Sequence, residues 1–125
     1  ITLDERIKHY SDNDSVSRAV ISVKNGVRNA KEEYQNEIHR LCKMLSFDNA
    51  SDSYLQFGAF AFYLDISSSA RKKSQKRIEQ IVGAFDNIVK EYKNVKSTFK
   101  GGDINKIKNI GEWAVGCYII EPDHN

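Results

Sequence analysis

The segment from Tyr54 to Ile66, YLQFGAFAFYLDI, offers almost no polar side chain to water and constrains the fold more than any other stretch. Four aromatic rings follow its first residue: Phe57, Phe60, Phe62 and Tyr63. Each ring hidden from water contributes on the order of 2 kcal/mol, so a segment that is apolar on every side is expected to be buried on every side. The segment therefore predicts a central element around which the other elements pack.

The length and composition are typical of one soluble globular domain covering residues 1–125. The chain has 125 residues, of which 40% are hydrophobic and 29% charged. It contains no apolar run of about 20 residues, so we expect no transmembrane segment. No signal peptide is visible, and Cys42 and Cys117 are too few and too far apart for a disulfide scaffold. These features predict buried free thiols in a cytoplasmic protein.

Two long stretches have apolar residues at helical spacing. In the first, the apolar positions are Val16, Val20, Val23, Val27, Ala30, Tyr34, Ile38, Leu41 and Leu45. In the second they are Ile78, Val82, Phe85, Val89, Tyr92, Val95 and Phe99. Steps of three and four residues predict amphipathic helices over 15–46 and 69–99. The second ends at the strongest stop signal in the chain, a glycine pair followed by Asp103.

The predicted fold is all-α, an elongated helical bundle with one long amphipathic helix hairpin. The aromatic element 53–66 lies inside it, small helices stand at both ends, and turns are expected at 11–14 and 47–53. The only proline is Pro122, so the body of the chain contains no residue that interrupts the helical hydrogen bonds, and this favours long helices. The alternative is an α+β fold with short strands at 54–66 and 112–120, because periodicity does not distinguish a buried helix from a buried strand. In that alternative, the two strands are each other's expected partners.

Positive charge is concentrated in residues 71–108, which hold eleven Lys or Arg against four acids. Attraction to phosphate requires such a basic surface, whether the phosphate belongs to nucleic acid or to an anionic surface. A solvated helix face is the ordinary alternative. If an anion binds the basic helix 70–100, the candidate residues are Arg71, Lys72, Lys73, Lys76, Arg77, Lys90, Lys93, Lys96 and Lys100.

Catalytic and metal-binding patterns are weak. His39 and Cys42, three residues apart, could supply half of a zinc site, but no second close pair accompanies them. The glycine pair at 101 and 102 lacks the Lys and Ser or Thr of a phosphate loop. We therefore expect no metal, no cofactor and no catalytic residue, and we interpret the protein as a non-enzyme.

The sequence from Glu33 to Lys100 resembles the helix, tip and helix portion of BAR-type membrane-curvature domains, through its aromatic run and a basic segment ending in VKSTFK. The resemblance implies a curved dimer on a membrane. The chain is shorter than a three-helix protomer of that family, and a membrane surface is the less favoured partner.

Surplus amphipathic surface without catalytic motifs favours a protein–protein interaction or assembly module, of the kind found in small regulators, inhibitors and immunity proteins. Its partner is another protein or a second copy of the chain. The alternative hypothesis is binding to nucleic acid or an anionic surface through the basic residues named above.

Overall fold

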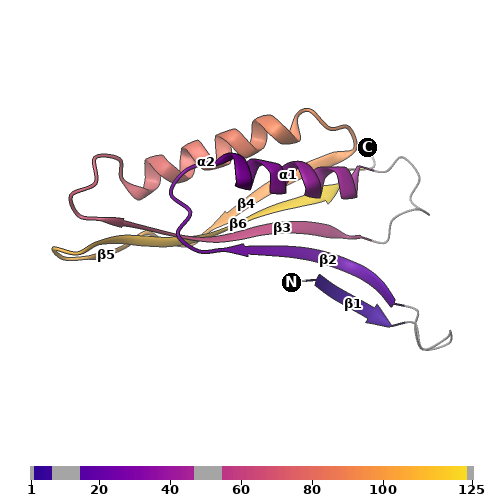
Figure 1. The fold of residues 1–125 in the computed structure, drawn as a ribbon, viewed down its shortest axis with the longest axis horizontal. Helices are drawn as coiled ribbons and strands as arrows, with labels where there is room; N and C mark the ends of the chain where they lie inside the picture. Colours follow the sequence, from indigo (N-terminus) through magenta and orange to yellow (C-terminus); the bar gives the residue numbers. More distant parts are fainter. Residues whose placement is uncertain (1, 7–14, 47–54, 124–125) are drawn as a thin grey trace.

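The computed structural model describes residues 2–6, 15–46 and 55–123, and their side chains from residue 19 onward. The elements follow in the order β1 (Thr2–Arg6), β2 (Ser15–Lys24), α1 (Glu32–Leu45), β3 (Phe57–Ser67), α2 (Ser74–Val89), β4 (Val95–Gly101), β5 (Asn105–Ile107) and β6 (Gly111–Pro122). The structure is therefore an α+β fold, with a mixed sheet and two helices (Figure 1).

The sheet has the strand order β1-β2-β3-β6-β4, and β5 pairs with the first residues of β6. Only β2 and β3 are parallel, and α1 connects them as a crossover helix. Figure 1 shows α1 and α2 on the same side of the sheet. The described residues thus form two layers, and one face of the sheet carries no helix.

The aromatic run is the central strand β3, and its side chains alternate between the two faces. Phe60, Phe62, Leu64 and Ile66 are buried against the helices. Gly58 allows α1 to approach, because a Cβ atom there would lie 2.9 Å from Cδ2 of Leu41. Large side chains on one face and a glycine beneath a helix therefore define the core side of the strand.

The core is built around the ring of Phe60, which is fully buried. Its ring centroid lies 5.6 Å from that of Tyr34 in α1 and 5.3 Å from that of Phe85 in α2. Both pairs have the edge-to-face geometry that aromatic quadrupoles favour. One side chain of β3 therefore joins both helices to the sheet.

A partly buried polar contact attaches α2 to β6, the last strand. The hydroxyl of Tyr118 in β6 donates a hydrogen bond to Oδ1 of Asp86 at 2.6 Å, and the hydroxyl of Ser97 in β4 lies 3.4 Å from the same oxygen. Burial, and then the bond to Asp86, raise the pKa of the Tyr118 hydroxyl. The tyrosine therefore remains a neutral donor.

Replacing Tyr118 with phenylalanine is expected to lower the free energy of unfolding by about 1.5–3 kcal/mol, the contribution of a hydrogen bond to a charged group. Chemical denaturation at neutral pH measures the change. Tyr63→Phe is the matched control, because Tyr63 lies on the helix-free face and its loss should stay within about 0.5 kcal/mol. Equal losses in the two variants would contradict a role for this polar contact.

The all-α prediction is wrong, and the alternative with strands at 54–66 and 112–120 is nearer the structure. Those segments become β3 and β6, and they pair as expected, with Ala61 opposite Cys117 in antiparallel register. The helix predicted over 15–46 is instead β2 followed by α1. Its apolar spacing continued across the boundary only by coincidence, while the β-branched run of β2 favoured a strand locally. Gly26, at φ +66°, lies in the connection between the two.

The helix predicted over 69–99 is also too long. The helix α2 ends at Val89, and Asn94, at φ +66°, turns the chain into β4. The small helices expected at the two ends are also absent from the described residues: β1 lies at the N-terminal end, and β5, a turn and β6 follow Asp103. The segment VKSTFK lies in β4, so the helix, tip and helix resemblance fails. The turns predicted at 11–14 and 47–53 lie outside the described residues.

Neither described helix has the length and apolarity that crossing a bilayer would require.

Candidate functional site

The sheet face opposite the helices carries apolar side chains that no other described element covers. We call it the open face: Ile21 and Val23 of β2, the odd-numbered residues 57–65 of β3 and 113–121 of β6, and the β4 and β5 residues in register with them. Five large apolar side chains on or beside it are 37% to 66% exposed: Val23, Tyr63, Ile107, Ile110 and Val115. Ala59 of this face is buried, but from Ala61 to Asp65 the central strand is partly or well exposed on the open face, whereas its other face is buried against the helices.

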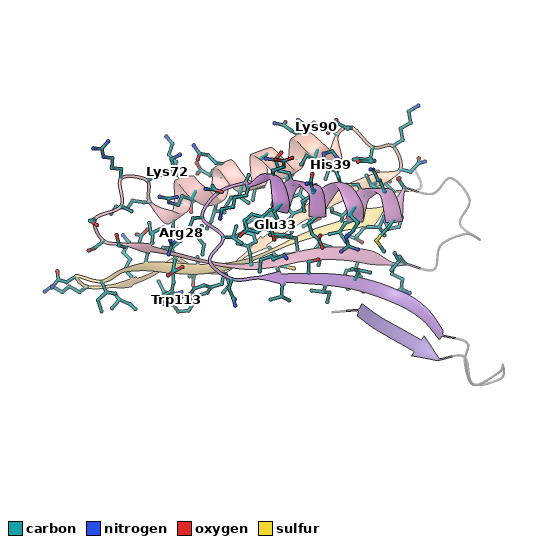
Figure 2. The ribbon with its side chains drawn as sticks, in the orientation of Figure 1. Arg28, Glu33, His39, Lys72, Lys90 and Trp113 are labelled. Atoms are coloured by element: carbon teal, nitrogen blue, oxygen red, sulfur yellow. The ribbon has the colours of Figure 1, made fainter. Side chains whose placement is uncertain are left out.

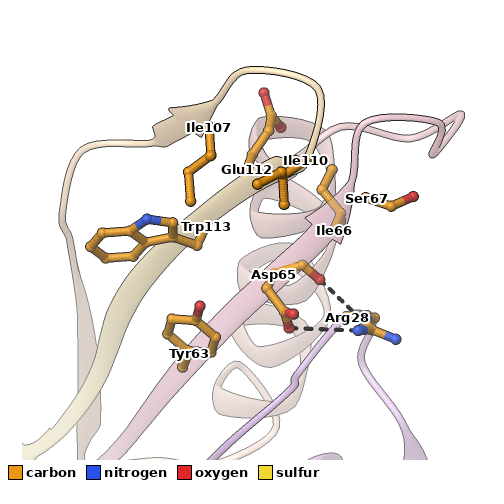
Figure 3. Close-up of a pocket in the computed structure, with 10 residues that line it drawn as sticks. Arg28, Tyr63, Asp65, Ile66, Ser67, Ile107, Ile110, Glu112 and Trp113 are labelled. Atoms are coloured by element: carbon orange, nitrogen blue, oxygen red, sulfur yellow. Dashed lines mark hydrogen bonds and ion pairs between the residues drawn. The ribbon is translucent and has the colours of Figure 1, made fainter.

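A pocket of about 300 Å³ opens at the β5 end of the open face. Figure 3 shows Trp113, Ile107 and Ile110 on one side of it and Arg28 with Asp65 on the other. The rings of Tyr63 and Trp113 stack with centroids 6.1 Å apart and planes 25° from parallel. The pocket thus combines aromatic, aliphatic and paired charged side chains.

Arg28 reaches the pocket from the connection between β2 and α1. Its Nε donates to the backbone oxygen of Asp65 at 3.0 Å, and its Nη2 lies 3.6 Å from Asp65 Oδ1. The connection is fixed on both sides: the N–H of Val27 donates to the carbonyl of Tyr63, and Nη1 of Arg77 donates to the carbonyl of Arg28, both at 3.0 Å. The pocket wall is therefore attached to β3 and α2 together.

This chemistry suits a protein surface. Aromatic residues and arginine are enriched in protein interfaces, and buried aromatic anchors in pockets dominate binding energies. Two charge pairs lie on the open face, Arg28 with Asp65 and Lys96 opposite Glu121 in strand register, whereas Lys100 lies opposite Cys117. Among the residues that the structure describes, no group of three His, Cys, Asp or Glu side chains is placed to hold a metal ion.

The nine candidate anion-binding residues do not form one patch. Arg71, Lys72 and Lys73 precede α2, with Lys76 and Arg77 in its first turns, whereas Lys90 and Lys93 follow its other end. Figure 2 shows Lys72 and Lys90 at opposite ends of the helix. Lys96 and Lys100 lie on β4, in register with odd-numbered residues of β6 on the open face.

Part of this set is engaged within the fold. Lys72 Nζ donates to Gln80 Oε1 at 2.8 Å, Lys73 Nζ to the carbonyl of Ser68 at 3.0 Å, and Arg77 Nε to the carbonyl of Lys72 at 2.9 Å. These bonds hold the connection before α2. The continuous basic helix expected over 70–100 is therefore absent, because α2 covers only 74–89.

A smaller basic group does form. Lys73, Lys106 and Lys108 line one shallow pocket of about 270 Å³, beside Glu112. Lys106 and Lys108 were not among the predicted residues, because β5 brings them to the start of α2 only in the folded chain. Glu112 weakens the positive potential of this pocket.

Glu112 also caps α2 from a distance. Its Oε1 accepts the backbone N–H of Ser74 at 3.0 Å, and this bond holds the pKa of the carboxyl below its ordinary value of 4.5. Lys73 is the N-cap residue of α2, and its side chain makes no capping hydrogen bond. A strand residue therefore satisfies the first turn of the helix.

Glu112→Gln is expected to destabilise the protein by about 0.3–1 kcal/mol at pH 7, because the amide oxygen can still accept the N–H of Ser74 but the negative charge at the helix N-terminus is lost. A lowered folded-state pKa contributes stability above pH 4.5 that disappears as pH falls through the folded-state value. The difference from wild type should therefore shrink in acid, as measured by denaturation at pH 7 and pH 3. Glu79→Gln is the control, because Glu79 is an exposed carboxylate on α2. A difference in unfolding free energy between Glu112→Gln and wild type that stays constant with pH would contradict the capping role.

His39 and Cys42 do not approach a second pair of ligands among the described residues. His39 Nδ1 lies 2.6 Å from the hydroxyl of Tyr92, and its Nε2 is 4.0 Å from Glu91. Cys42 is buried as predicted, and burial raises its pKa to about 11. Cys117 is only partly buried, because it belongs to the open face. Neither cysteine forms a disulfide.

No family model, curated protein or solved structure matches this chain.

Arg28, Tyr63, Asp65 and Trp113 were absent from the predicted site. A signal was present in the aromatic run, where Ala59, Ala61 and Tyr63 alternate with Phe60, Phe62 and Leu64. An apolar strand with two faces of unequal size indicates two different packing partners. That signal could be used only once the run was known to be a strand.

Proposed function

We propose that this protein is a non-enzymatic protein–protein interaction or assembly module that binds through the open face of its sheet. One observation carries the proposal: the helices bury one face of β3, while on its other face Tyr63 and its neighbours Val23 and Val115 are 37% to 56% exposed. Contiguous exposed apolar surface of this kind marks interaction sites in soluble proteins. The two free thiols are consistent with a cytoplasmic location.

The test compares the wild type with Val115→Glu and with Gln80→Glu. Val115 is 47% exposed at the middle of the open face, and Gln80 is exposed on α2. Each variant adds one carboxylate, but only the first adds it to the proposed interface. Solution mass and the proteins captured from a host extract are measured for all three, with circular dichroism as the folding control. Val115→Glu should lose the association and Gln80→Glu should keep it.

Identical masses and identical captured proteins for the wild type and Val115→Glu would contradict the proposal.

A second candidate function is binding of an anionic group at Lys73, Lys106 and Lys108, favoured by the convergence of these side chains on one pocket. A fluorescent single-stranded oligonucleotide is the probe. Binding should weaken steeply with salt and be lost in a Lys106→Glu, Lys108→Glu double variant. Affinity that is indifferent to salt would contradict it.

A further inference from the structure

The open face is bulky at one end and small in its middle. Ala61 and Cys117 are directly opposed in register, and the next opposed pair along the strands is Tyr63 and Val115. Trp113 follows on the same face, beside the pocket. At the other end, Phe57 begins β3 with a partly exposed ring and does not belong to the core cluster beneath the helices.

We propose that the open face binds a second copy of this chain, with a two-fold axis running across the strands. This inference rests on the proposed function and names its partner. The axis makes the two β3 strands antiparallel, so that Tyr63 lies over Ala61 of the second copy and Val115 over its Cys117. Bulky residues then face small ones twice, which is the self-complementarity that a two-fold interface requires.

The same operation brings Phe57 to the pocket. With the two-fold axis at residue 62, residue 57 of one copy lies opposite residue 67 of the other. Ser67 lines the pocket beside Ile107 and Ile110, so Phe57 of each copy faces the pocket of the other. An aromatic ring entering a pocket of about 300 Å³ with apolar walls is the typical anchor of a protein interface. The symmetric contact forms twice in the dimer.

The area and the charge of the face also fit. Four strands about 4.8 Å apart, with about 3.3 Å per residue over the 11 residues of β3, give a face of roughly 700 Å² per copy. A standard interface buries about 800 Å² per partner. Arg28 pairs with Asp65 and Lys96 lies opposite Glu121, and Lys100, opposite Cys117, extends from the edge strand β4 toward solvent, so repulsion between two copies is limited. Two twisted sheets packing face to face form a stable sandwich.

The first experiment is analytical ultracentrifugation of the full chain over a range of concentrations. We expect a dimer for the wild type and for Gln80→Glu, and a dissociation constant raised roughly 100-fold for Val115→Glu, because its new carboxylate would be buried without a partner. A wild type that stays monomeric overturns the inference. If Val115→Glu nevertheless loses capture of a different protein, the proposed function survives and only the identity of its partner is wrong.

The second experiment tests the two-fold axis. Phe57→Glu and Ile110→Lys should each be monomeric alone. A mixed dimer has two pocket contacts. In one, Glu at position 57 of the first variant meets Lys at position 110 of the second; in the other, the native Phe57 of the second variant meets the native Ile110 of the first. We therefore expect a heterodimer. Native circular dichroism of each variant establishes folding. A mixture that stays monomeric overturns the placement of Phe57 in the pocket.

Discussion

Phe60→Ala is expected to lower the free energy of unfolding by about 3–5 kcal/mol, which is a large part of the stability of a domain of this size. The ring of Phe60 is fully buried and contacts rings of both helices, at centroid distances of 5.6 Å to Tyr34 and 5.3 Å to Phe85. Its removal therefore leaves a cavity where three elements meet. Urea denaturation measures the loss as a lower midpoint at an unchanged m-value.

Tyr63→Ala is the matched control, because it removes an aromatic ring from the same strand. Tyr63 is 37% exposed on the open face, so the loss should be about 1 kcal/mol in protein dilute enough to be monomeric. The contrast tests the alternation of β3 directly. Equal losses for the two variants would mean that both faces of the strand are buried within one chain.

Gly111→Ala is expected to cost about 3 kcal/mol, at the upper end of the range for overpacking. A Cβ atom at position 111 would lie 2.0 Å from the backbone oxygen of Ile66, and backbone does not move aside as a flexible side chain does. The first residues of β6 would separate from the end of β3, and the pocket beside Trp113 would widen. Thermal unfolding measures the loss, and Trp113 fluorescence reports the local change.

Gly83→Ala serves as the control for a glycine-to-alanine change. Gly83 lies within α2, and no atom is within 4 Å of a Cβ placed there. Alanine should therefore stabilise the protein by about 0.5–1 kcal/mol through its better helix propensity. A stable Gly111→Ala variant would contradict the close approach of β6 to β3.

The open face and the core depend on the same strand. Apart from Gly58 beneath α1, the residues of β3 that point to the helices are large, and those at 59 and 61 that point away are alanines. A strand in the middle of a sheet with helices on one side only normally carries polar residues on its second face. In β3 the second face is apolar from Phe57 to Tyr63, and Tyr63 on it is 37% exposed; this mismatch between sequence and coverage is the physical basis for proposing a partner.

The sequence by itself indicated that residues 54–66 are central and that helix lies within 15–46 and within 69–99, although it extended both helices far beyond the bounds of α1 and α2. It also marked a stop after Lys100, where β4 ends at Gly101. These conclusions depend on local chemistry: apolar content, helical spacing and glycine. The sequence also named the two segments, 54–66 and 112–120, that pair if they are strands.

Only the tertiary structure decided between helix and strand, because a run that is apolar at nearly every position satisfies both periodicities. Strand pairing then placed Arg28 beside Asp65, and Lys73 beside Lys106 and Lys108, through hydrogen bonds between segments far apart in the chain. Within the part of the chain that the structure describes, it also left one face of the sheet without a helix. Coverage is a property of the whole arrangement of layers, so no local pattern in the sequence could reveal it.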